Sequence, residues 1–536
     1  MRCVPCLLVA LASAAPCCAG TVSATVSPAF EGWFRAGWPV LLRVALGNEG
    51  AALDGTLDVT VEGVTYRLPA QVGAQTRGTV EALVVVHSES ARARVAVRSA
   101  AGEVVFDGVM ELGLHSASGD SPLVAWAGAG GKEATRLFGD RCTAVSAGEL
   151  PGLAAGYSAV DAVLVAGDGS GVPPGALVDW VRGGGLVAFV LEGGAPVRAE
   201  GVLARLGEVA GRATAEEWLS AVAGVQATRR LNGARVWRVG LGKVAAGTKG
   251  ELAKGAFAGL IPTQARGDVW VDKGVYDVFG PASWSLGVRW RLVGGVAVLL
   301  AAGAMLARFA SRRRWALAGG AVLGLAAGLT ALAWAVGLPG GRCVLGLAGV
   351  LERVAGEQGG WRTELVGVAA TGPARARLDF GAAEAVVPVY YSAADAGGWG
   401  DVVVARDGSG RWSVECGVTG GVRRGFAGWW AWTAASGAEE GARAGSVLVR
   451  DGEYGVAGAG GGVPTEGWRP LSELSQWGEA DRALVRWQAR RARPGRTYLV
   501  SWQEVTRSAV SGTRLLEERK RPTLVWTEAV GGTGAE

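Results

Sequence analysis

Histidine is almost absent from this chain of 536 residues, which contains only His87 and His115. An isolated histidine on a strand or in a linker is usually structural. Two histidines so placed cannot by themselves hold a metal ion, so no metal site is predicted. No residue after His115 can itself supply a histidine base.

Cysteine is scarce beyond the first 20 residues. Four of the seven cysteines precede residue 20, and the other three, Cys142, Cys343 and Cys416, are far apart in the sequence. Their number and spacing fit neither a disulfide framework nor a zinc site. Small buried cysteines are therefore favoured, and a single Cys142–Cys416 bridge is the alternative.

The chain also lacks the patterns of a nucleic-acid or cofactor site. The net charge is only +5, and no block of lysine or arginine is interleaved with aromatic residues. Nucleic-acid binding therefore has no support. The sequence Gly240-Leu-Gly242 precedes no helix and is not a dinucleotide motif, so no cofactor is predicted.

The N-terminus reads as a secretory leader, residues 1–20. Met-Arg is followed by the apolar run Cys3–Ala15 and then by small residues. These are the parts of a signal peptide, with cleavage expected after Ala19 or Gly20. Lipid attachment at the adjacent cysteines and retention as an uncleaved helix are the alternatives.

Residues 288–338 predict a transmembrane helix hairpin. The runs Leu292–Ala307 and Trp315–Leu338 carry no charge, and the turn 308–314 between them is rich in arginine. A spanning helix needs about 20 mostly apolar residues, which the second run supplies and the first reaches with its flanks. Arginine-rich turns stay in the cytoplasm, as the positive-inside rule requires.

The hairpin and the leader together predict localisation and partners. They place the protein in the inner (cytoplasmic) membrane with both large domains extracytoplasmic, that is, periplasmic. The lipid bilayer is then a partner, together with an unidentified membrane or periplasmic protein. Small residues are dense in both apolar runs, which allows homo-oligomer contacts between the helices.

Residues 21–118 predict an N-terminal β-sandwich. Short alternating runs, among them Leu57–Val61, Ala91–Val97 and Val104–Leu112, are separated by turn residues. Such regular spacing is typical of antiparallel sandwiches. The opening, with Trp38-Pro-Val and Asn48-Glu-Gly50, resembles the immunoglobulin-like modules of secreted bacterial proteins.

Residues 119–265 change to strands that alternate with helices. Val160–Ala166 and Leu186–Leu191 read as buried strands, and the segment between them, 175–182, reads as a helix after two prolines. This alternation predicts a flavodoxin-like α/β domain with a parallel, doubly wound sheet.

Several features of residues 120–250 occur in the order of a known family. They are Leu150-Pro, Tyr157, Asp161, Leu177-Val-Asp-Trp180-Val-Arg-Gly-Gly-Gly185-Leu-Val and the hairpin-like run Val236–Ala245. The series resembles the class I glutamine-amidotransferase-like domain. Active members carry a nucleophilic cysteine after the strand equivalent to Leu186–Leu191, with a histidine downstream. Here Glu192-Gly193-Gly194 follows that strand, so the resemblance implies a domain without catalytic residues.

The ligand-binding edge of such a sheet lies beyond the carboxyl ends of its strands. That edge supplies the candidate ligand-binding residues Gly128, Asp168, Ser170, Glu192 and Gly193. Asp168 and Glu192 could also act as a general acid and base. The alternative is that the sequences around them only form turns.

The remaining chain comprises a membrane-proximal linker, residues 266–287, and a β-rich extracytoplasmic domain, residues 339–536. The sequence as a whole favours a membrane-anchored extracytoplasmic binding or scaffold protein of the bacterial envelope, without its own catalysis. One alternative is an accessory subunit of a membrane transport or envelope-assembly complex. Another is a hydrolase or transferase that uses Asp168 and Glu192.

Overall fold

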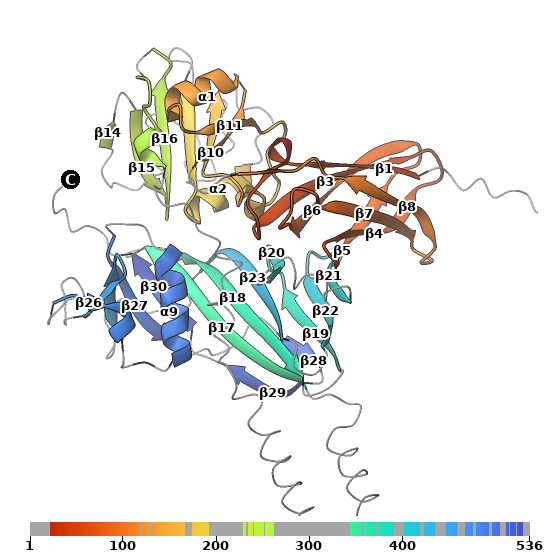
Figure 1. Cartoon of the computed structure of the whole chain (residues 1–536). Helices are drawn as coiled ribbons and strands as arrows, with labels where there is room; N and C mark the ends of the chain where they lie inside the picture. The colour runs from red at the N-terminus through yellow and green to blue at the C-terminus, as the bar shows by residue number, and fades with distance from the viewer. Residues whose placement is uncertain are drawn as a thin grey trace, which may run out of the picture.

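A computed structural model of the chain is drawn in Figure 1. It describes residues 22–261 and 343–528 except for gaps, the longest of which are 167–173, 192–228, 390–400, 435–445, 458–466 and 504–510. Residues 1–21, 262–342 and 529–536 lie outside the described residues.

The N-terminal region is a sandwich of two antiparallel layers. One layer has the order β1-β3-β6, with β1 (Val22–Pro28), β3 (Pro39–Asn48) and β6 (Thr76–Val85). The other layer has the order β5-β4-β7-β8, with β5 (Val64–Val72), β4 (Leu53–Val61), β7 (Arg92–Ser99) and β8 (Val104–Glu111). Alternate residues of β5 are buried between the layers, as apolar alternation predicts. The Val85 N–H of β6 donates to the Tyr66 hydroxyl of β5 (3.0 Å) and ties the layers together.

Strands from the far end of the chain extend the second layer. They are β21 (Val402–Arg406), β22 (Trp412–Val418), β19 (Ala374–Gly381) and β28 (Ser511–Thr513). Strand β21 runs parallel to β5, with Val402 opposite Val64. The result is one eight-stranded sheet, ordered β28-β19-β22-β21-β5-β4-β7-β8.

The middle of the chain forms a seven-stranded mixed sheet, ordered β11-β10-β12-β13-β16-β15-β14. Its first five strands are parallel: β11 (Thr143–Ser146), β10 (Leu123–Ala127), β12 (Ala162–Ala166), β13 (Leu186–Leu191) and β16 (Gly242–Thr248). Its last two are antiparallel: β15 (Ala234–Val239) and β14 (Arg229–Leu231). Helices α1 (Gly131–Phe138) and α2 (Pro174–Arg182) pack against it. All five residues of β12 are buried, which explains its unbroken apolar sequence.

A ten-stranded sheet lies below the mixed sheet in Figure 1. Nine strands follow the order β20-β23-β18-β17-β30-β27-β24-β25-β26, and β29 pairs with β17. Their bounds are β20 (Ala385–Val389), β23 (Arg423–Ala434), β18 (Gly359–Ala370), β17 (Cys343–Val354), β30 (Thr523–Glu528), β27 (Tyr498–Gln503), β24 (Val447–Arg450), β25 (Glu453–Val456), β26 (Arg469–Pro470) and β29 (Leu515–Lys520). Helix α9 (Glu479–Arg491) buries Leu484 and Val485 in the same core.

Short elements complete the described chain. Strands β2 (Trp33–Phe34) and β9 (His115–Ser116) pair in parallel. The 3₁₀ turns are η1 (Phe30–Gly32), η2 (Ala154–Tyr157), η3 (Ala258–Leu260) and η4 (Leu471–Glu473). Cys142 and Cys416 are free thiols, so the alternative of a bridge between them is excluded. Burial raises the pKa of the Cys142 thiol.

These observations correct the fold class predicted from the sequence. The described chain is predominantly β, with three α-helices in its described part. The N-terminal sandwich and the C-terminal β-rich region are not separate layers, because β5 and β21 pair within one sheet. The middle sheet is mixed, with an antiparallel edge at β15 and β14, and is not the flavodoxin-like doubly wound parallel sheet that was expected.

The predicted membrane anchor is corrected as well. No helix in the described part of the chain is long and apolar enough to cross a membrane. This finding contradicts the two-helix transmembrane hairpin and the inner-membrane, periplasm-facing localisation that depends on it. The hairpin residues 288–338 and the predicted signal peptide, residues 1–20, themselves lie outside the described residues.

Candidate functional site

The ligand-binding edge predicted from the sequence falls mostly outside the described residues. Of the five candidate residues, Gly128 is described. The other four lie in gaps: Asp168, Ser170, Glu192 and Gly193. Gly128 has a φ of +96°, and a Cβ built on it would lie 1.9 Å from the Ala166 carbonyl oxygen at the end of β12. Its lack of a side chain therefore serves the close approach of two strand ends. The ligand-binding role of the other four stays a prediction.

The described residues place a different set of polar groups around residues 149–157, the junction segment, which contacts both the N-terminal sandwich and the C-terminal region. Two of its contacts come from the N-terminal sandwich. Arg43 of β3 donates to the Glu149 carbonyl oxygen (2.7 Å) through Nη2. Glu81 of β6 accepts a hydrogen bond from the Gly152 N–H (3.2 Å) and pairs with Arg43 (3.5 Å). One side of the junction segment is thus held by a charged pair.

The other side is held by Glu384 of the C-terminal region. Glu384 immediately precedes β20, and its own N–H donates to the Trp429 carbonyl oxygen of β23 (2.8 Å). Its Oε1 accepts a hydrogen bond from the Ala154 N–H at 2.5 Å, and the Ala155 N–H also donates to this carboxyl group. Leu153, at the N-cap of η2, offers no side-chain acceptor. Glu384 therefore caps η2 from another part of the chain.

The environment of Glu384 shifts its titration. Burial raises the pKa of Glu384 to about 7, against the opposing effect of the Ala154 N–H donor. The negative charge of Asp179 in α2 raises this pKa further, whereas the Ala155 N–H and the positive charge of Arg406 in β21 lower it. Oε2 of Glu384 is inaccessible to solvent and has no hydrogen-bond partner among the described residues. The carboxyl group therefore exchanges its proton near neutral pH, where an ordinary glutamate is fully ionised.

Aromatic packing supports the same junction. Tyr157 ends η2, is fully buried and donates its hydroxyl proton to the Pro151 carbonyl oxygen (3.0 Å). Its ring stacks on Trp180 of α2 with centroids 5.3 Å apart. A Cβ added to Gly183, just beyond α2, would lie 2.8 Å from the ring of Trp361 in β18. Apolar contacts of the mixed-sheet region and of the C-terminal region thus lie beside the junction segment.

A second polar link joins the sandwich to the mixed sheet. Arg35 pairs with Asp161 (Nη2 to Oδ2, 2.5 Å) and donates through Nε to the Ala159 carbonyl oxygen (3.2 Å). Asp161 also accepts the Leu123 N–H at the start of β10 (2.8 Å). Both charged side chains are largely buried, so their charges are balanced by each other rather than by water.

The chemistry open to these groups is limited. Glu384 has the pKa of a general acid or base, but the donors to its carboxyl group are backbone amides, and no nucleophilic side chain hydrogen-bonds to it in the described part. Across the described residues, no cluster of three or more His, Cys, Asp or Glu could hold a metal ion. His87 pairs with Glu62 (2.8 Å), whose carboxylate also accepts the His87 and Ser88 N–H groups, which is a structural role.

Comparisons with known proteins leave the family open. No protein-family model matches the chain, and no curated protein does. The CARDB domain of a Pyrococcus furiosus protein, in complex with di-metal ions, matches with TM-score 0.15 and 12% identity over 18% of this chain and 90% of that chain. A Paenibacillus sp. cycloisomaltooligosaccharide glucanotransferase, complexed with cycloisomaltoheptaose, matches with TM-score 0.15 and 11% identity over 26% of this chain and 20% of that chain. Neither similarity supports a function, and the amidotransferase-like resemblance stays a prediction.

Sequence reasoning missed Glu384 and assigned other meaning to its neighbours. Leu150, Tyr157 and Asp161 were read as marks of a family, whereas the structure shows them buried or paired at the contacts between regions. One signal was present: Glu384 is the only charged residue in the run Gly381–Val389. A lone acid in an apolar run marks either a satisfied buried group or a perturbed one.

Proposed function

We propose that this chain is a binding protein without catalysis of its own, in which the three regions form one support for contacts with a partner protein. The observation that carries the proposal is the use of Glu384. Among the described residues, the carboxyl group whose pKa is raised to near neutrality is that of Glu384, and it caps η2 across a boundary between regions instead of facing a reacting group. In this proposal the carboxyl group of Glu384 serves to hold the regions together.

Two further contacts support a fixed arrangement. Strand β21 pairs with β5, so the C-terminal region cannot move away from the sandwich without breaking a sheet. The buried Arg35–Asp161 pair joins the sandwich to the mixed sheet. Separating the regions would break the ladder between β5 and β21 and leave two buried charges without partners, which is costly. Such a support is what a scaffold needs.

The rival function is a hydrolase or transferase, and the pKa of Glu384 is the observation that favours it. The two functions differ in what removal of the carboxyl group does. In a scaffold, Glu384→Ala loosens the junction, while Glu384→Gln keeps the acceptor for the Ala154 N–H and leaves it closed. In an enzyme that uses Glu384 as acid or base, both variants lose turnover.

The test uses the tagged full-length chain, purified gently from the cells that make it. The wild type, Glu384→Gln and the exposed control Glu453→Ala should retain a protein partner at the same fixed stoichiometry, and Glu384→Ala should retain less. Amide hydrogen exchange at residues 149–157 should rise only in Glu384→Ala. Turnover of any small molecule that disappears in Glu384→Gln, with the fold intact, would overturn the proposal.

A further inference from the structure

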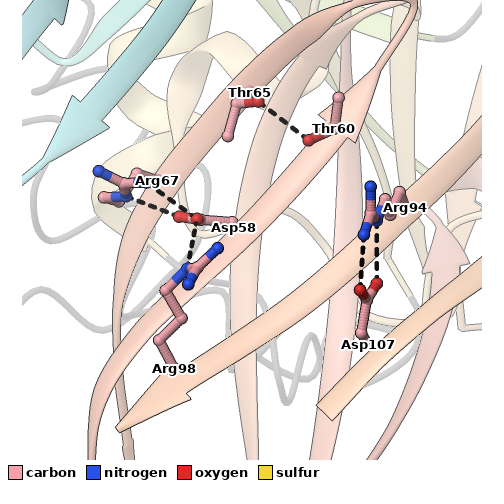
Figure 2. A network of polar contacts seen from close by, with 7 residues as sticks. All are labelled: Asp58, Thr60, Thr65, Arg67, Arg94, Arg98 and Asp107. Atoms are coloured by element: carbon pink, nitrogen blue, oxygen red, sulfur yellow. Dashed lines mark hydrogen bonds and ion pairs between the residues drawn. The ribbon is translucent and has the colours of Figure 1, made fainter. Parts of the chain in front are cut away.

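The outer face of the sandwich carries charges that alternate in sign from strand to strand. Figure 2 shows Arg67 of β5 and Arg98 of β7 on either side of Asp58 of β4, which accepts from both (2.7 and 3.3 Å). Arg94 of β7 makes a two-bond pair with Asp107 of β8 (2.9 and 2.6 Å). The order across the sheet is thus basic, acidic, basic, acidic.

Strand β8 ends this series with acidic residues. Its outward positions include Asp107 and Glu111, which pair with Arg94 and Arg92 of β7 on one side only. Among the described residues, no strand pairs with the other side of β8, which is the last strand of the eight-stranded sheet. Figure 1 shows β8 on the outer side of the sandwich, away from the other two regions. A carboxylate has room for about four hydrogen bonds, so both acids can accept more.

The same strand exposes apolar surface on both faces. Of four large hydrophobic side chains exposed in the described part, three lie on β8: Val104 (49%), Val105 (37%) and Val109 (64%). On the inner face, Phe106 and Met110 pack against the core but are only partly buried. A free edge with exposed apolar residues is a template for pairing with another strand.

We propose that β8 binds an extended segment of a partner protein by strand addition, and that this segment alternates apolar residues with lysine or arginine. The inference rests on the proposed binding function and names its surface. Apolar side chains of the added strand cover Phe106 and Met110 on the inner face. Basic side chains on the outer face lie beside Asp107 and Glu111 and continue the alternation of charge.

A second copy of the chain fits this edge less well. Antiparallel pairing of two β8 strands centred on Val109 would place Asp107 opposite Glu111 of the other copy. Like charges directly opposite destabilise a sheet. Centring on Gly108 would place Asp107 opposite Val109 and give the acids no basic partner from the second copy. The charge pattern therefore favours a different, basic strand.

The test measures binding of fluorescent peptides to the full-length chain by anisotropy. The probe is a capped heptapeptide of alternating valine and arginine, and the controls replace arginine with glutamate or group all the arginines at one end. The alternating basic peptide should bind at least tenfold more tightly than either control, and more weakly as salt rises. Because the chain carries a net charge of +5, overall attraction would favour the acidic peptide instead.

Two matched variants locate the site. Val109→Lys, on the outward face of β8, should weaken binding at least tenfold, whereas Val456→Lys, at an exposed valine of β25, should leave it within twofold. Bound peptide should slow amide exchange at residues 104–111. Equal binding of the acidic peptide, or no effect of Val109→Lys, would overturn the inference, as would a β8-dependent dimer that excludes the peptide. A partner retained from cells by Val109→Lys would refute this surface and leave the proposed function standing.

Discussion

The carboxyl group of Glu384 accepts a hydrogen bond from the Ala154 N–H, a residue 230 positions earlier in the chain. This contact caps a 3₁₀ turn of the mixed sheet region from the edge of the ten-stranded sheet. It lies at the meeting point of two large folding units, and the acid that makes it titrates near neutral pH. The stability of the junction should therefore depend on pH.

Glu384→Gln should remove a pH dependence of stability. The pKa of Glu384 is about 7 in the folded chain and near 4.5 when unfolded, so the folded state binds the extra proton between these values. The free energy of unfolding therefore falls by up to about 3 kcal/mol as pH rises from about 4.5 to about 7. Above about pH 7 it no longer changes through this group. Glutamine cannot ionise and keeps an acceptor for the Ala154 N–H.

Urea unfolding at pH 5, 6, 7 and 8 measures this difference. The gain in stability of Glu384→Gln over the wild type should be smallest at pH 5 and largest at pH 8. Glu453→Gln, at an exposed position of β25, is the control and should give no such trend. Parallel curves for wild type and Glu384→Gln would show that the carboxyl group is ionised throughout.

The Arg35–Asp161 pair should show strong coupling in a double-mutant cycle. Removing one partner leaves the other charge buried, at a cost of about 3–5 kcal/mol. Asp161→Asn keeps an acceptor for the Leu123 N–H, so its cost should report mainly the loss of the charge. Arg35→Met with Asp161→Asn should cost clearly less than the sum of the single changes. Additive costs, measured by denaturant unfolding, would mean that water already screens the pair.

Gly128→Ala should be far more damaging than Gly102→Ala. Both glycines have positive φ, +96° and +84°, so either alanine is strained by about 1–2 kcal/mol. Only at Gly128 would the new Cβ also overlap the Ala166 carbonyl oxygen, whereas Gly102 has open space. Overlap in a packed region adds about 1–3 kcal/mol. Thermal unfolding of the two variants compares the costs, and equal values would exclude the strand-end contact as the reason for glycine.

Local elements were largely predictable because their signals are local. The alternation in Val104–Leu112 predicts the strand seen as β8, Val104–Glu111. The prolines before residue 175 predict the start of α2, Pro174–Arg182. The apolar run Leu186–Leu191 coincides with β13. Each of these patterns depends on side chains within one element.

Assembly was not predictable for the same reason. The pairing of β5 with β21 joins Val64 to Val402, and nothing in either strand identifies a partner so distant in sequence. The fold class was wrong at this level, because the two β regions share a sheet. Glu384 was missed because its donors, Ala154 and Ala155, contribute only backbone N–H groups, which leave no mark in the sequence.

Asp58 and Asp107 provide a matched pair of outer-face carboxylates that should differ in cost. Asp58 is buried beneath Arg67 and Arg98 and accepts three hydrogen bonds from them, whereas the Asp107–Arg94 pair is exposed. Asp58→Asn should cost about 1.5–3 kcal/mol, the value of hydrogen bonds to a buried charge. Asp107→Asn should cost much less, because water already screens an exposed pair.

High salt separates the two carboxylates further. The exposed Asp107–Arg94 pair is screened within a Debye length of about 3 Å at 1 M salt, so the small cost of Asp107→Asn should vanish. The cost of Asp58→Asn should persist because the arginine side chains shield this carboxylate from ions. Denaturant unfolding at low and high salt measures both. If the two costs were equal and equally sensitive to salt, Asp58 would behave as a surface residue, and the outer face would be a set of independent pairs rather than a continuous series of charges that β8 presents to a partner.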